Sequence, residues 1–124
     1  MEFVKLLYNS SSYSYKGSTS IKMDIVGLFL ESDVGCYWPT FKAWALDDSQ
    51  ASMNSNITVL EKENGNILLS DLYSEESMPT EVHMTIKQFI QLLDDWENKV
   101  CKLRPKEVII KHENGEFIIE TSNK

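Results

Sequence analysis

The segment TIKQFIQLLDDWENKVCKLRPKEVIIKHENGEFIIET, residues 85–121, carries the clearest structural pattern of this 124-residue chain. Thr85, with Gln88 three positions later, fits a capping box, in which each side chain satisfies a free backbone N–H of the other residue at a helix start. Pro105 ends the helix, because proline cannot continue it. Between them, apolar residues recur at the 3.6-residue spacing of an amphipathic helix: Ile86, Phe89, Ile90, Leu93, Trp96, Val100 and Leu103.

A β-hairpin is predicted directly after this helix. Asn114 and Gly115 supply the two residues with positive φ that a type I′ turn requires. Alternation along the two strands predicts one face packed against the helix and one face that is largely solvated. The packed face holds Val108, Ile110, His112, Phe117 and Ile119, and the solvated face Ile109, Lys111, Glu113, Glu116, Ile118 and Glu120.

A second hairpin is predicted over residues 57–72, around the turn residues Asn64 and Gly65. A two-residue loop pairs Glu63 with Asn66. Both faces of this hairpin are apolar, so it is expected well inside a sheet. Leu60, Ile67 and Leu69 fall on one face, and Ile57, Val59, Leu68 and Leu72 on the other.

The other segments have less distinctive patterns. Residues 2–8 and 21–30 are predicted as strands, the second with Ile21, Met23, Ile25 and Phe29 on one face. Residues 9–20 are either a polar loop or a short strand extension, and residues 73–83 are predicted as an acidic linker.

Residues 36–55 allow two interpretations. Thr40 can cap a short helix that places Phe41, Trp44 and Ala45 on one face. The same residues can form a strand with Phe41, Ala43 and Ala45 on one side. The whole chain, residues 1–124, is predicted to be a single α+β domain: an antiparallel sheet built from hairpins, with one main amphipathic helix packed on it.

The net charge of −7 is unevenly distributed. Residues 31–100 carry thirteen acids and four lysines, whereas residues 1–30 and 101–124 each carry one more base than acids. An acidic surface repels nucleic acid and anionic membranes and attracts basic partners. A surface that only keeps the protein soluble would have the same composition. No apolar run reaches the length of a membrane helix, and the N-terminus lacks a signal peptide pattern, which together predict a cytoplasmic protein.

No motif for catalysis or metal binding is recognisable. His83 and His112 lie outside any metal-ligand spacing, and neither Cys36 nor Cys101 has a cysteine close by in sequence. A cysteine hydrolase that pairs one cysteine with His83 is disfavoured, because Cys101 is expected to be a packing residue of the helix. We therefore expect no enzyme, no catalytic or metal-binding residues and no cofactor. In a reducing cytosol, two free thiols are expected rather than a disulfide.

Residues 84–97, MTIKQFIQLLDDWE, and 104–110, RPKEVII, resemble the C-terminal part of small bacterial immunity proteins. Such proteins accompany polymorphic toxins and contact-dependent growth inhibition systems. The resemblance rests on a Phe…Leu-Leu…Trp helix, a Lys/Arg-Pro stop and a Glu-Val-Ile-Ile strand that leads into the Asn-Gly hairpin. It implies cytoplasmic residence, no catalysis and tight binding to the C-terminal domain of a cognate toxin, in many cases a basic nuclease.

Acids in irregular segments are the predicted contacts with such a toxin, because loops carry most binding function. These are Asp47, Asp48, Glu75 and Glu76, followed by Glu31 and Asp33. Trp38 or Trp44 could anchor a partner if exposed, although burial in the core is expected. The alternative function is a non-catalytic adaptor or regulatory protein that binds another basic partner. Neither function involves nucleic acid or a membrane as the partner.

Overall fold

The computed structural model of the chain describes residues 2–9, 12–36, 40–47, 49, 51–55, 57–72 and 80–123. The elements follow one another as β1 Glu2–Asn9, β2 Ser12–Ser18, α1 Ile21–Leu28, η1 Phe29–Val34, α2 Thr40–Leu46, β3 Ser52–Asn54, β4 Thr58–Glu63, β5 Asn66–Asp71, β6 Glu81–Thr85, α3 Ile86–Asp95, η2 Trp96–Cys101, β7 Glu107–Glu113 and β8 Glu116–Ser122. The segments η1 and η2 are π-helical continuations of α1 and α3.

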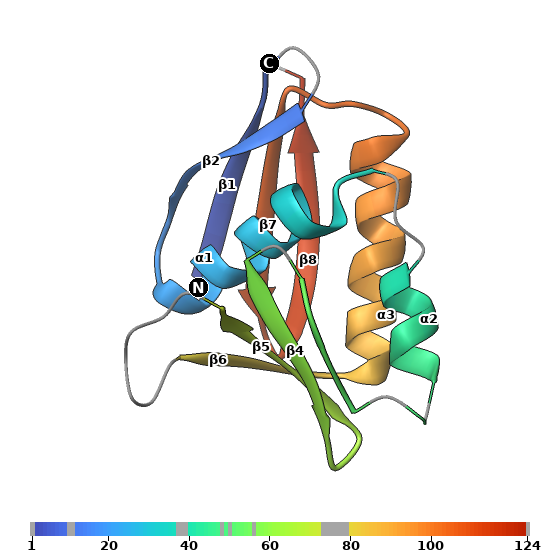
Figure 1. Cartoon of the computed structure of the whole chain (residues 1–124). Helices are drawn as coiled ribbons and strands as arrows, with labels where there is room; N and C mark the ends of the chain where they lie inside the picture. Colours follow the sequence, from blue (N-terminus) through green and yellow to red (C-terminus); the bar gives the residue numbers. More distant parts are fainter. Residues whose placement is uncertain are drawn as a thin grey trace.

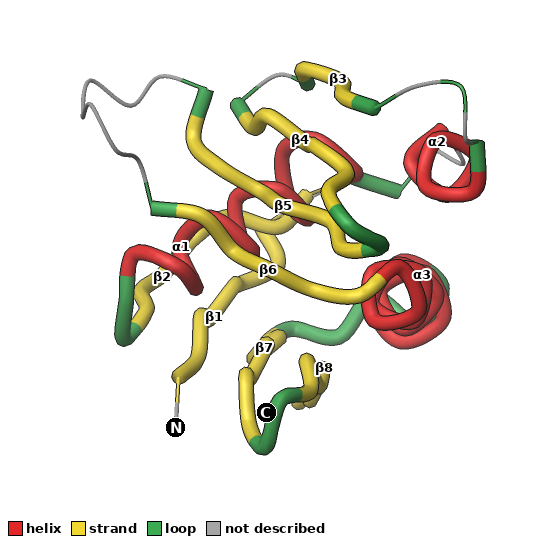
Figure 2. The backbone as a smooth tube through the Cα atoms, turned by 90° about the horizontal axis from the view of Figure 1, so that it is seen from below, coloured by secondary structure: helices red, strands yellow, loops and turns green. Residues whose placement is uncertain are grey.

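The strands form two antiparallel four-stranded sheets, which confirms the α+β class. Sheet A has the order β2-β1-β7-β8, and sheet B has the order β3-β4-β5-β6. Helix α1 runs between the two sheets, and α3 runs along the side of the molecule beside α2 (Figures 1 and 2). The two predicted Asn-Gly hairpins are the central pair of sheet B and one end of sheet A.

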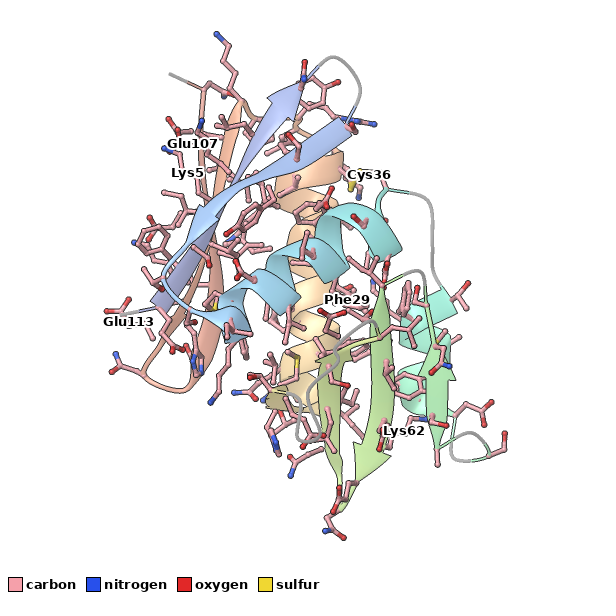
Figure 3. All side chains as sticks on the ribbon, turned by 60° about the vertical axis from the view of Figure 1, so that its left-hand side comes forward. Lys5, Phe29, Cys36, Lys62, Glu107 and Glu113 are labelled. Carbon is pink, nitrogen blue, oxygen red and sulfur yellow. A yellow bond between two sulfur atoms is a disulfide. The ribbon has the colours of Figure 1, made fainter. Side chains whose placement is uncertain are left out.

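One hydrophobic core joins both sheets and the helices. Sheet A contributes Val4 and Ile110, and sheet B contributes Leu69, all fully buried. Phe29 of η1, labelled in Figure 3, is also fully buried. Its ring centroid lies 5.1 Å from that of Phe41 on α2 and 5.9 Å from that of Phe89 on α3. The aromatic contacts therefore hold the three helical segments against one another.

The predicted helix after Thr85 is confirmed, with its capping box. The backbone N–H of Gln88 donates to Thr85 Oγ1 at 3.0 Å, and the backbone N–H of Thr85 donates to the side-chain Oε1 of Gln88 at 2.8 Å. Within the predicted apolar face, Leu103 is the exception, since it is 71% exposed. The helical spacing fails there because the helix ends at Cys101. Leu92, which that spacing did not select, is buried.

Both hairpins have the predicted turns and registers. The φ angles are +52° and +80° at Asn64 and Gly65, and +53° and +80° at Asn114 and Gly115, as a type I′ turn requires. Glu63 pairs with Asn66, as predicted.

The prediction of a strand over residues 21–30 is wrong, because these residues form α1 and the start of η1. Ser20 caps the helix, and its hydroxyl accepts the Met23 N–H at 3.3 Å. Met23, Val26 and Leu30 are buried at helical spacing. Apolar residues occupy most positions of this segment, so both alternation and the helical period fit it. The serine cap is the signal that separates the two.

The structure also gives the secondary structure of three segments whose sequence patterns were less distinctive. Residues 12–18 are strand β2, which pairs with β1, and residues 40–46 are helix α2 rather than a strand. The linker prediction is wrong for residues 81–83, because they begin strand β6 and pair with β5. Residues 73–79 of that predicted linker lie outside the described residues.

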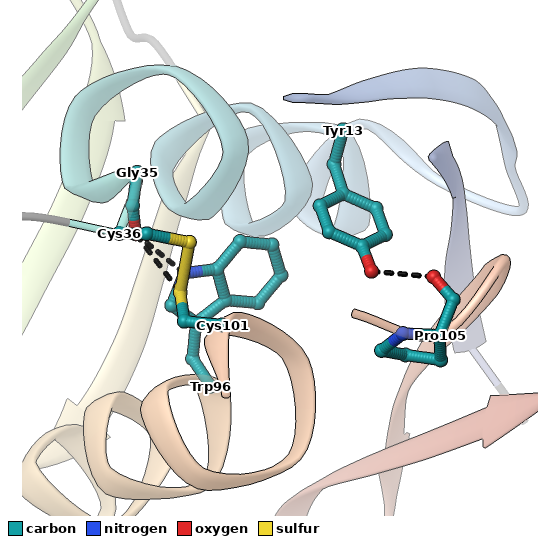
Figure 4. Close-up of a disulfide and its surroundings, with 6 residues drawn as sticks. All are labelled: Tyr13, Gly35, Cys36, Trp96, Cys101 and Pro105. Carbon is teal, nitrogen blue, oxygen red and sulfur yellow. Dashed lines mark hydrogen bonds between the residues drawn. A yellow bond between two sulfur atoms is a disulfide. The ribbon is translucent and has the colours of Figure 1, made fainter. Parts of the chain in front are cut away.

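The prediction of two free thiols is also wrong. Cys36 and Cys101 form a disulfide, with their Cα atoms 5.5 Å apart (Figure 4). The prediction assumed a reducing cytosol, and sequence alone did not show that the ends of η1 and η2 meet. Within the described part of the chain, the helices are too short or too polar to cross a membrane.

Candidate protein-binding surface

The strand pairings of sheet B sort its side chains onto two faces. Met53, Leu60, Leu69 and Val82 form one row across the four strands. Leu60, Leu69 and Val82 belong to the core, and Met53 packs against it. Because side chains alternate along a strand, the neighbouring rows point the other way. Helix α1 lies on the core side of sheet B (Figures 1 and 2), so the neighbouring rows make up an outer face.

The outer face of sheet B combines an apolar centre with exposed carboxylates. Leu68 is buried in the row between Glu61 and His83. Glu61, Glu63 and Glu81 are exposed. None of the described residues on this face is a lysine or arginine. The described residues of the outer face are Ser52, Asn54, Ile57, Val59, Glu61, Glu63, Asn66, Leu68, Ser70, Leu72, Glu81, His83 and Thr85.

Lys62, the lysine of strand β4, is held on the other side of the sheet. Its Nζ donates to the backbone carbonyls of Trp44 and Asp47 at the end of α2. The same Nζ lies 4.5 Å from the centroid of the Trp44 ring, a cation–π contact. These contacts keep the positive charge of Lys62 away from Glu61 and Glu63, its neighbours along the strand. The carboxylates of the outer face therefore stay without a cation from β4.

The outer face of sheet A is organised differently. Lys5 and Glu107 lie on it as an ion pair with Nζ and Oε2 3.3 Å apart (Figure 3). Lys111 and Glu120 form a second pair across β7 and β8, at 2.5 Å. Such exposed pairs contribute little stability, but each cancels a charge. A basic partner is therefore attracted less strongly to the centre of this face than to the outer face of sheet B.

Of the acids predicted from the sequence, Asp47 is exposed and Glu31 is half-buried. The Ser49 hydroxyl and N–H donate to the Asp47 carboxylate at 2.6 Å and 2.8 Å. These two hydrogen bonds hold the pKa of Asp47 below its ordinary value. Burial raises the pKa of Glu31, against the opposing effect of a hydrogen bond from Ser32. Asp47 is thus the more strongly ionised of the two.

Asp33 has a structural role. It is 4% exposed. Its carboxylate accepts the Ile57 N–H at 3.2 Å and the Thr58 N–H at 3.1 Å, and it also accepts the Thr58 hydroxyl. A carboxylate enclosed in this way fixes the start of β4 and is inaccessible to a partner. We therefore leave Asp33 out of the candidate surface.

Asp48, Glu75, Glu76 and Trp38 lie outside the described residues. Trp44 is buried, as expected. The sequence interpretation favoured loops and so missed Glu61, Glu63 and Glu81, which stand on strands. The alternation of the first Asn-Gly hairpin contained the signal for two of them, because Glu61 and Glu63 share a face with Val59.

The two cysteines and His112 are engaged in contacts within the fold. Both cysteines are oxidised, so they present no thiolate nucleophile. His112 stacks on Phe117 with centroids 4.6 Å apart, and its Nδ1 lies 3.4 Å from Glu2 Oε2, as in a half-buried sheet residue. Across the described ranges, no three histidine, cysteine, aspartate or glutamate side chains are grouped to hold a metal ion. In comparisons with known proteins, the chain matches no protein-family model, no curated protein and no solved structure.

Proposed function

We propose that the protein is a non-catalytic immunity protein, which binds a cognate toxin domain and neutralises it by direct contact. The supporting observation is the outer face of sheet B, where the exposed carboxylates of Glu61, Glu63 and Glu81 share a face with apolar side chains such as Leu68. The partner chemistry that fits this face is a basic protein surface with apolar side chains at its middle. A basic nuclease domain, as implied by the family resemblance, has that chemistry.

Charge and apolar area have different effects in this proposal. The carboxylates attract a basic domain over a distance and raise its association rate, an effect that salt weakens. The half-buried side chains Ile57, Val59 and Leu72 exclude water once contact is made. Asp47 is exposed at the end of α2, but Lys62 lies beside it on the other side of sheet B, so Asp47 is not part of this face. Binding in this way blocks the toxin by covering either its active site or the nucleic-acid path beside that site.

A cytoplasmic location belongs to the same proposal, since the resemblance implies it. The disulfide between Cys36 and Cys101 argues for an oxidising compartment instead, because cytosolic thiols are kept reduced. Fractionation of the native host with antibody detection distinguishes the two. Alkylation of the extract with a thiol-specific reagent reports, in the same experiment, whether the disulfide is closed in the cell.

The test of function is to look for a toxin gene beside the gene for this protein and to coexpress the two proteins. We expect growth to be restored and a stable complex to be isolated by gel filtration. If cells die although both proteins are made in soluble form, the immunity function is ruled out. A basic partner recovered from the native host that is not a toxin would instead support the alternative of an adaptor or regulatory protein.

A further inference from the structure

The disulfide closes a junction where the ends of η1 and η2 meet. Cys36 follows η1, Cys101 ends η2, and both residues are half-buried. The Trp96 indole N–H donates to the Gly35 carbonyl oxygen at 2.7 Å, and Cys101 Sγ lies 3.5 Å from the same oxygen (Figure 4). The covalent bond and the indole hydrogen bond therefore act on neighbouring residues of one turn.

The same turn is also hydrogen-bonded to sheet B, through the carboxylate of Asp33. Asp33 precedes Cys36 by three residues, and its buried carboxylate holds the N–H groups of Ile57 and Thr58 at the start of β4. No other element separates the disulfide from this carboxylate. The end of η1 thus joins η2 to the first residues of β4.

Gly35 lies in the turn between Asp33 and Cys36, and both of its backbone polar groups are hydrogen-bonded, the N–H to Leu30 and the carbonyl to the Trp96 indole. Its φ is +56° with ψ −143°, a conformation that L side chains rarely adopt. Its N–H donates to the Leu30 carbonyl at 3.0 Å and closes the π-helical turn. Because these hydrogen bonds fix the turn, we expect a displacement of Cys36 to reach Asp33, three residues earlier.

We propose that the Cys36–Cys101 disulfide is a redox-sensitive clamp on the outer face of sheet B. When it is closed, Asp33 holds Ile57 and Thr58, and with them the apolar side chains of Ile57 and Val59, in the geometry that binds a partner. When it opens, only the hydrogen bond from the Trp96 indole to Gly35 still joins the end of η1 to η2, and the start of β4 loosens. The link to partner binding rests on the proposed function, whereas the loosening of β4 does not.

The opening step is thiol–disulfide exchange. A thiolate of a small reductant such as glutathione attacks one sulfur, the bond between Cys36 and Cys101 breaks, and a mixed disulfide forms. A second reductant thiolate attacks the mixed disulfide and leaves as oxidised glutathione. The two electrons pass to the protein sulfurs, and each takes up a proton to become a thiol. Because both cysteines are half-buried rather than enclosed, a small thiol can reach them.

A disulfide that acts on β4 alone can be distinguished from one that stabilises the whole fold by which amides exchange faster after reduction. Amide hydrogen exchange is compared in the oxidised protein and in protein reduced with dithiothreitol. For a clamp, the Ile57 and Thr58 amides exchange roughly tenfold faster after reduction, while the amides of β7 change by less than about twofold. An equal acceleration in β4 and β7, including complete unfolding, overturns the proposal. So does the absence of any change at Ile57 and Thr58.

Two variants sharpen this result. Cys36→Ser combined with Cys101→Ser reproduces the reduced exchange pattern without reductant. Asp33→Asn weakens the connection from the other side, so the Thr58 amide exchanges rapidly in both redox states and reduction adds little. If reduction still accelerates Thr58 tenfold in the Asp33→Asn variant, the disulfide does not act through Asp33.

Partner binding is measured separately, with the coexpressed toxin as the probe. The clamp predicts weaker toxin binding by reduced than by oxidised protein. A protein that shows local loosening but never binds the toxin contradicts the proposed function and leaves the clamp in place. A protein that binds the toxin equally well in both redox states contradicts the regulatory part alone.

Discussion

Gly27 of α1 lies against Val4 of β1 so closely that a Cβ on Gly27 would stand 2.6 Å from Val4 Cγ2. Val4 is fully buried and β-branched, so its side chain has little freedom to turn away. The contact is what allows α1 to lie directly on the middle of sheet A. It is also the basis of the first prediction.

Gly27→Ala should destabilise the protein by about 1–3 kcal/mol, the usual cost of overpacking a core. The gain in helix propensity, about 1 kcal/mol, opposes this and is expected to be smaller than the steric cost. Urea denaturation measures the difference. Gly17→Ala is the matched control, because a Cβ there meets nothing within 4 Å. A Gly27→Ala protein as stable as the wild type would contradict the close packing of α1 on β1.

Thr85→Ala should remove one half of the capping box that begins α3, at a cost of about 0.5–2 kcal/mol. Thermal or chemical denaturation checks this. Thr85→Ser keeps the hydroxyl that accepts the Gln88 N–H and should remain close to the wild type. If serine and alanine are equally destabilising at Thr85, the loss comes from the methyl group and not from the cap.

Glu31→Gln should stabilise the protein at neutral pH. Burial raises the pKa of Glu31, so the folded state holds its proton more tightly than the unfolded chain does. The ionised carboxylate therefore destabilises the fold, and glutamine removes that charge. The advantage should shrink as the pH falls through the pKa of Glu31, where the wild-type carboxyl takes up its proton. Denaturation at a series of pH values tests this.

Glu116→Gln, at an exposed position of β8, controls for the loss of one negative charge. A gain of equal size in both variants would mean that net charge, rather than burial of Glu31, sets the effect.

Charge-reversing substitutions on the two sheets should show which outer face binds the toxin. Glu61→Lys with Glu63→Lys is expected to weaken toxin binding roughly tenfold or more at low salt, and to flatten its salt dependence. Glu113→Lys with Glu116→Lys makes the same change in net charge and, like the first pair, lies beside an Asn-Gly turn. It should bind normally. Titration calorimetry at two ionic strengths measures both. The opposite ranking would move the interface to sheet A.

The sequence predicted those parts of the fold whose signals are local. Asn64-Gly65 and Asn114-Gly115 set both turns and registers, and Thr85 with Gln88 set the start of α3. Residues 21–30 were assigned incorrectly because a helix between two sheets is apolar on most sides. Such a segment loses the periodicity that distinguishes a helix from a strand. Ser20 was the local signal of a helix start, and the sequence interpretation did not use it.

The candidate site was less accessible from sequence. Asp33 and Asp47 are both acids near element ends, yet one is enclosed by backbone N–H groups of β4 and the other is exposed. That difference depends on contacts between residues far apart in the chain. The disulfide is another such case, since 65 residues separate its cysteines. Net charge located the acidic middle of the chain, and alternation in the hairpin placed Glu61 and Glu63 on one face, but only the pairing of β6 with β5 showed that Glu81 shares that face.

The order of strands in sheet A has a consequence for synthesis of the chain. Strand β1 lies between β2 and β7, and Val4 pairs with Ile110. While the ribosome is still making the middle of the protein, β1 is therefore paired only with β2, and its other edge is open to the cell. Open edges pair readily with other chains. A nascent or prematurely terminated chain without β7 and β8 is thus expected to aggregate through β1, whose edge is covered only once β7 has emerged.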